Sequence, residues 1–297
     1  MVIGLGLAPV AVNMAMGKAG DGSAQLVPYD IAIWIAMISL ATTVAFAVMA
    51  KGIFRLIPIM FGVITGYALS AIMGIVDTSA IQAAPWLGIP AFAAPEFSWA
   101  AILFMIPVAI APAIEHIGDV LAIGTVTGKD YLKKPGLHRT LLGDGVATSA
   151  AALVGGPPNT TYSEVTGAVM LTRNFNPRIM VWAAVTAVVL AFIGKFGAAL
   201  QTIPVPVMGG ILCLLFGSIA VVGLNTLIRH QVDLSEARNL VITGVTLVFG
   251  IGGMVIGQVE GIALCGLVAI ALNLILPGSR SGWGDETIPE PGSAQSE

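Results

Sequence analysis

The sequence predicts an all-α polytopic membrane protein, and three observations lead to that prediction. The 297 residues are 57% hydrophobic and only 10% charged, whereas soluble domains carry about 25% charged residues. Apolar runs of membrane-spanning length recur along the chain, and lysine and arginine gather in a few loops between them. The apolar runs make the lipid bilayer the expected partner. The formal net charge of −3 offers no basic face, so we do not expect the protein to bind nucleic acid.

The apolar runs define the predicted elements in order, because a spanning helix needs about 20 such residues. Four uncharged runs reach that length: 31–50, 56–76, 196–228 and 239–259. Five shorter or interrupted runs cover 1–17, 97–126, 141–154, 179–194 and 261–276. We therefore predict nine full or near-full spans and one broken segment at 155–173.

The positive charges predict the orientation of these spans. Loops rich in lysine and arginine alternate with connections that are poor in them, and the connection at 77–97 has neither residue. Positive loops stay in the cytoplasm, so the acidic tail at 277–297 should be cytoplasmic as well. Its proline, glycine and serine content predicts disorder. No charged region of a secretory signal opens the sequence.

Four acids lie inside the apolar stretches: Glu115, Asp119, Asp144 and Glu164. Each is costly in lipid and should face the protein interior or water. Glu115 and Asp119 are spaced i, i+4 and share a helix face. Two close carboxylates do not both ionise readily, so one should hold a proton near neutral pH. The pair is a candidate for proton coupling, and the alternative is a hydrated helix end.

The remaining reactive residues carry no recognisable chemistry. His116 points about 100° away from Glu115 on a helix, which favours a packing or interface role. The two cysteines, Cys213 and Cys265, lie in separate apolar runs without metal or disulfide spacing. HExxH and GxSxG motifs are absent from the sequence. We expect no catalytic residue, no metal and no cofactor.

The stretch "GGPPNTTYSEV" at 155–165 interrupts an apolar region. Two consecutive prolines cannot continue a helix, and irregular backbone at membrane depth survives only in protein or beside a cavity. Thr161 to Glu164 matches a capping box, which predicts that a half-helix starts there. Broken helices mark the binding sites of secondary transporters. Glu164 is therefore a candidate substrate contact, and its alternative is a capping role alone.

These residues resemble the nucleobase–ascorbate transporter family, and its bacterial uracil permease branch most closely. The resemblance covers nearly the whole chain except the tail. It is strongest in "IEHIGDVLAIG", "KDYLKKPGLHRTLLGDG", "GGPPNTTYSE" and "IPVPVMGGI". The family signature appears as "EVTGAVMLTR", with Glu164 first and Arg173 last.

The resemblance implies a function and a site. It implies proton symport of a nucleobase, uracil in the first place, with Glu115 and Glu164 holding the pyrimidine. Uracil has two N–H donors and ionised carboxylates are acceptors, while its carbonyls can take backbone N–H groups near Tyr162 and Ser163. Asp119 and Glu115 are the implied proton-coupling residues. A xanthine or purine permease, sodium coupling and a homodimer stay open.

Two positions depart from the family pattern. Val165 stands where the signature has asparagine, which removes a polar group from the half-helix. Asp119 stands where the best-studied uracil permease type has a histidine. An aspartate can still carry a proton if Glu115 lies beside it. These changes leave the substrate and the pH dependence open.

The family fold implies two inverted repeats of seven segments, which form a core and a gate domain. Aligned by its motifs, the chain begins inside the fifth segment and lacks the first four. The implied parts are gate helices at 1–76, an extracellular or periplasmic loop at 77–97, half of the core at 98–200, gate helices at 201–276 and the tail at 277–297. The implied location is the bacterial inner membrane. Alternatives are a transport-incompetent fragment and, more distantly, an anion transporter, which the acids disfavour.

Overall fold

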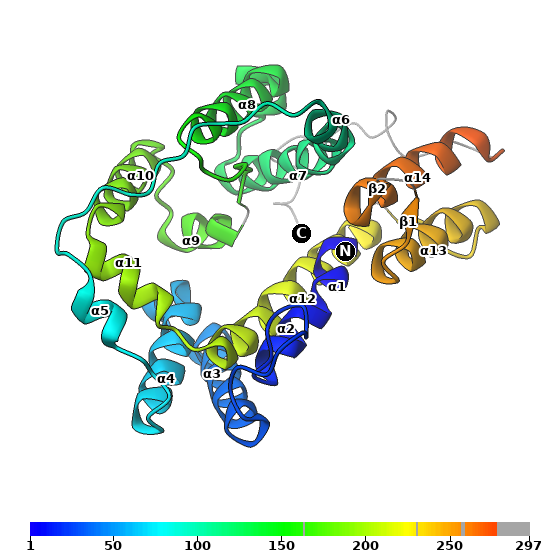
Figure 1. Cartoon of the computed structure of the whole chain (residues 1–297). Helices are drawn as coiled ribbons and strands as arrows, with labels where there is room; N and C mark the ends of the chain where they lie inside the picture. Colours follow the sequence, from blue (N-terminus) through cyan, green and yellow to red (C-terminus); the bar gives the residue numbers. More distant parts are fainter. Residues whose placement is uncertain (163, 230, 257–258, 278–297) are drawn as a thin grey trace, which may run out of the picture. The chain divides into compact units, whose positions relative to one another are not determined.

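The computed structural model describes residues 1–162, 164–229, 231–256 and 259–277 (Figure 1). It is mostly helical, which confirms the predicted helical class. Its backbone contacts divide the chain into two compact units. The first contains Met1, Ile3–Ala93 and Leu171–Val221, and the second contains Val2, Ala94–Met170 and the chain from Val222 onward. The predicted tail, from residue 278, lies outside the described residues.

The first unit is built mainly from two long helices and several short ones. Its elements are α1 (Val2–Gly6), α2 (Ala8–Ala15), α3 (Tyr29–Met49), the 3₁₀ turn η1 (Gly52–Leu56), α4 (Pro58–Ile72), α5 (Ser79–Ala83), α10 (Arg178–Ala191), α11 (Gly194–Gln201) and the first part of α12 (Val205–Arg229). Proline is the second residue of α2 and the first residue of α4, where the backbone N–H has no partner within the helix and its loss costs little.

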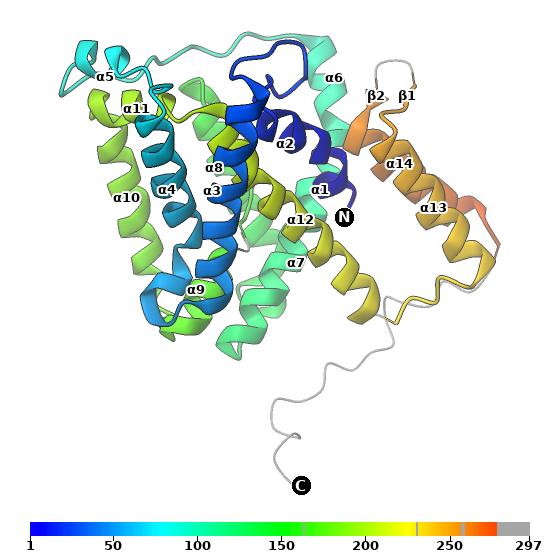
Figure 2. The same cartoon turned by 90° about the horizontal axis from the view of Figure 1, so that it is seen from below.

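The core of this unit lies where α3, α4 and α12 meet. Ile35, Val207 and Ile211 are buried there. α3 and α4 lie side by side (Figures 1 and 2), and the small residues Gly62 and Gly66 face α3. Such residues let helix backbones approach closely, which is how helices associate where the surrounding lipid removes the hydrophobic driving force.

A bend between α10 and α11 is attached to the loop at 77–97. The two helices meet at 87°. The Gly88 N–H donates to the Phe192 carbonyl (2.9 Å), and the Gly194 N–H donates to the Trp86 carbonyl (3.2 Å). Lys195 Nζ donates to the Ile81 carbonyl (2.9 Å) and lies 5.3 Å from the Trp86 ring centroid. The loop is therefore hydrogen-bonded to the end of α10 and to the start of α11, on either side of the bend.

The second unit contains the predicted site. Its elements are α6 (Trp99–Val108), α7 (Ile110–Thr127), the π turn η2 (Leu132–Gly136), α8 (Leu137–Leu153), α9 (Glu164–Thr172), α13 (Ala237–Ile251), β1 (Val255–Ile256), β2 (Val259–Glu260) and α14 (Gly261–Ile275). α7 packs against α6, α8 and α14. The antiparallel pairing of β1 with β2 joins α13 to α14, which lie side by side (Figure 2).

Apolar runs and spanning helices do not correspond one to one. Within the described residues, α3 and the Val205–Asn225 part of α12 are long and apolar enough to cross a membrane, and α10 with α11 makes a third candidate if the bent pair is one span. The number of full-length spanning helices is therefore lower than the nine predicted spans, because the backbone breaks inside several runs.

The breaks have local causes. The run at 196–228 divides at residues 202–204, before a helix that starts next to Pro204. The run at 239–259 ends as a helix at Ile251, because the chain turns at Gly253 with φ +67° and then enters β1. Left-handed backbone of this kind is accessible to glycine at little cost. Apolar composition alone did not reveal these interruptions.

Candidate functional site

The predicted acids Glu115 and Asp119 lie on α7, one turn apart. Glu115 is exposed, whereas Asp119 is half-buried. The Asp119 Oδ2 atom is buried, and no described residue forms a hydrogen bond with it. A buried carboxylate oxygen without a partner is costly when it is ionised.

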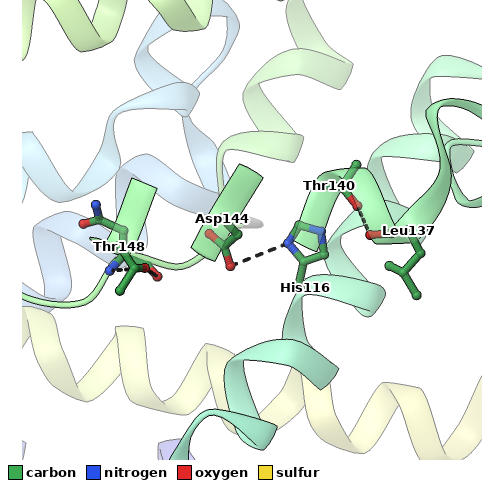
Figure 3. A network of polar contacts seen from close by, with 6 residues as sticks. His116, Leu137, Thr140, Asp144 and Thr148 are labelled. Carbon is green, nitrogen blue, oxygen red and sulfur yellow. Dashed lines mark hydrogen bonds and ion pairs between the residues drawn. The ribbon is translucent and has the colours of Figure 1, made fainter. Parts of the chain in front are cut away.

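His116 lies between them on α7 and meets the neighbouring helix α8. The residue is 3% exposed, which fits the predicted packing role. Its Nδ1 atom lies 3.8 Å from Asp144 Oδ2, and Asp144 points toward it from α8 (Figure 3). Neither ring nitrogen has a hydrogen-bond partner among the described residues. Packing alone leaves this polar pairing unexplained.

The predicted helix break follows α8, and a hydroxyl of α8 holds it. After Leu153 the chain leaves the helix, and the prolines of "GGPP" remain outside regular structure. Thr148 Oγ1 donates to the Asn159 carbonyl (2.9 Å) and accepts from the Asn159 N–H (3.2 Å). The Asn159 side chain also reaches the Ala147 carbonyl (3.4 Å). One threonine thus satisfies both backbone groups of a residue in the break.

No described strand pairs with the break. The sheet among the described residues joins β1 to β2, and the one isolated bridge joins Lys18 to Gln25. Thr148 provides an alternative to a strand partner for one residue of the segment.

The start of the half-helix differs from the predicted capping box. α9 begins at Glu164. Thr161 Oγ1 is buried and has no hydrogen-bond partner among the described residues. Tyr162 is 60% exposed. Ser163 and the side chain of Glu164 lie outside the described part of the chain, so the predicted approach of Glu164 to Glu115 stays a prediction.

The second unit also has an open, largely apolar pocket of about 410 Å³ between the start of α6 and the end of α8. Its polar lining residues are Glu96, Ser98 and Ser149, and it includes none of the predicted site residues. Among the described residues, no three histidine, cysteine or acidic side chains gather as a metal site would require.

Sequence reasoning named Asp144 but did not recognise the polar face of α8 to which it belongs. Thr140, Asp144 and Thr148 recur every fourth residue, which places them on one face of a helix. That spacing could have predicted a polar stripe. It could not have predicted that His116 and Asn159 are the partners of its members.

Comparison with known proteins decides the family. The model of the Permease family matches residues 1–259. The chain belongs to this permease family. It is 58% identical over 285 residues to a probable uracil permease of Pasteurella multocida, covering 95% of the chain and 67% of that protein. It is 45% identical over 289 residues to a uracil permease of Bacillus caldolyticus, with 94% and 66% covered.

A more distant relative extends the same pattern. The uracil permease of Escherichia coli K12 is 40% identical over 278 residues, which cover 92% of the chain and 64% of that protein. The chain thus spans about two thirds of the length of these curated relatives. The findings confirm the resemblance to the nucleobase–ascorbate transporters. Membership of a permease family indicates that the chain is a multi-pass membrane transporter and not an enzyme.

Proposed function

We propose that the protein is a secondary active transporter that imports uracil together with protons. The proposal rests on sequence identity: over most of its length the chain is 40–58% identical to proteins named uracil permeases. The structure adds support, because acids of α7 lie in one unit with a helix break of the kind that transporters use for binding.

The proposed uracil contacts come from two helices. The carboxylates of Glu115 and Glu164 would accept the two ring N–H groups, since ionised carboxylates are acceptors only. The backbone near Tyr162 and Ser163 would donate to the ring carbonyls. The positive end of α9 favours negative charge and carbonyl oxygens at this position. The site needs no cofactor or metal.

The proposed coupling proton lies on α7. Asp119 carries a buried oxygen without a hydrogen-bond partner among the described residues, and Glu115 stands one turn before it. A proton bound by Asp119 would remove the cost of a buried charge. Binding of uracil and of the proton would then favour the same state of the carrier.

The remaining proposals concern architecture. We assign 1–76 and 201–276 to the gate and 98–200 to the core of a seven-plus-seven inverted-repeat fold. The packing of α3 and α4 with the first part of α12 supports the assignment of those helices to one domain. The proposed location is the bacterial inner membrane, with a cytoplasmic C-terminus and a homodimer as the assembly.

The test is uptake of radiolabelled uracil by bacteria that lack their own permease and express the complete protein containing residues 1–297. Uptake should depend on an imposed inward proton gradient. The Glu164→Ala variant should lose affinity, and its uptake at unchanged affinity would remove Glu164 from the binding site. Stronger competition by xanthine than by unlabelled uracil would identify the protein as a purine permease. No uptake of either base would show a transport-incompetent protein.

A further inference from the structure

The starting point is the pair formed by His116 and Asp144, which the proposed uracil and proton contacts do not use. The imidazole is almost fully buried, and both of its nitrogens lack hydrogen bonds among the described residues. Buried polar groups nearly always have a partner, so an orphaned pair of nitrogens requires an explanation. The nearest charged atom given by the structure is Asp144 Oδ2, at 3.8 Å from Nδ1.

At 3.8 Å, the two side chains face each other but are too far apart to form a direct hydrogen bond. An N–H···O hydrogen bond requires about 2.7–3.2 Å between the heavy atoms. The side chains already point toward each other across the contact of α7 with α8 (Figure 3). An approach of less than about 1 Å would form a direct bond. The bond would be charge-assisted if the imidazole were protonated and the carboxylate ionised.

The charged groups near His116 come from α7 itself and from α8. Of the helices packed against α7, α6 and α14 contain no charged residue, so α8 supplies the charged group from another helix. On α7 itself the acids are Glu115 and Asp119, and α8 also begins with His138 and Arg139, both exposed. Histidine is the side chain that normally changes charge between about pH 5 and 8.

α8 connects this pair to the substrate side of the proposed site. Thr148 lies one turn beyond Asp144, on the same face (Figure 3). Its hydroxyl bonds to both backbone groups of Asn159 in the segment that precedes α9. Because a helix moves as a rigid element, displacement of α8 at Asp144 is passed on to this segment.

We propose that His116 and Asp144 are a proton-responsive positioning pair. Protonation of His116 closes the pair, draws α8 toward α7 and brings the segment at 155–162 into the position that binds substrate next to Glu115. This inference rests on the proposed function for its biological meaning. Its structural content, a segment whose order follows the charge of His116, can be tested without substrate.

The first experiment measures hydrogen–deuterium exchange of peptides covering 155–162 in the purified complete protein without uracil. After correction for the intrinsic pH dependence of exchange, protection should rise about fivefold or more between about pH 7.5 and pH 5.5, in the range typical of coupled sites. His116→Gln and Asp144→Asn should each abolish the rise, and the double variant should resemble either single variant. His138→Gln, which changes an exposed histidine at the start of α8, should behave as the wild type.

The outcomes separate this inference from the proposed function. Protection in the wild type that does not depend on pH overturns the inference even if a variant fails to fold. A pH response that persists in His116→Gln overturns it as well. Uracil affinity is then measured over the same pH range, and it should become independent of pH in His116→Gln. If exchange responds through His116 but uracil does not bind, the proposed function fails and the positioning pair stands.

Discussion

Gly210 should be intolerant of a single added methyl group, because its α-carbon lies against the backbone of α3. A Cβ at this position would stand 3.0 Å from the carbonyl carbon and 3.1 Å from the Cα of Ala36, and closer still to the Ala36 carbonyl oxygen. Ala36 is itself 2% exposed and cannot move into free space. The Gly210→Ala variant must therefore push α12 away from α3.

The magnitude follows from two opposing contributions. Alanine favours a helix over glycine by about 1 kcal/mol. Overpacking a close contact costs about 1–3 kcal/mol, and a backbone neighbour places this site at the upper end. We expect Gly210→Ala to lower the free energy of unfolding by about 2 kcal/mol. Gly217 lies on the same helix with no atom within 4 Å of its added Cβ, so Gly217→Ala should be neutral or stabilise by up to about 1 kcal/mol.

The assay is reversible unfolding of the purified protein in mixed micelles by titration with a denaturing detergent, followed by circular dichroism. The two variants carry the same chemical change on one helix, so their difference of about 2–3 kcal/mol isolates the helix contact. Equal stabilities of Gly210→Ala and Gly217→Ala would refute the reasoning, because they would show that α12 does not approach α3 at Gly210.

Three further predictions follow from the bonds of the site and of the loop. Thr148→Val removes the hydroxyl that is hydrogen-bonded to Asn159. Losing these hydrogen bonds should weaken the binding free energy of uracil by about 1–2 kcal/mol, which should raise KM about 5- to 30-fold with little change in kcat. Ser149→Ala, which removes a hydroxyl bonded only within α8 among the described contacts, should leave both constants unchanged. Asp119→Asn should retain uracil binding but weaken accumulation driven by a pH gradient, and accumulation equal to the wild type would favour the hydrated helix end. Lys195→Met should speed hydrogen exchange in the loop at 77–97 about 10-fold, because a carbonyl bond and a cation–π contact are lost together.

The sequence by itself determined the class of protein and the position of its main break. Composition excluded a soluble domain, and the apolar runs matched helices such as α3 and α8. Pro157 and Pro158 interrupt the helix through their own covalent structure, so the break could be predicted without any neighbour. The acids Glu115 and Asp119 were recognisable because a charge in an apolar run is rare at any position.

Only the tertiary structure decided which side chains meet. His116 and Asp144 are separated in the sequence and belong to different helices, and their pairing depends on the rotation and depth of α7 against α8. Thr148 holds Asn159 because the chain folds back along α8 after the break. The lengths of the helices were decided in the same way, since runs at 196–228 and 239–259 break where the backbone turns. Periodicity reports the face of one element, whereas contacts between elements arise from packing that acts across the whole unit.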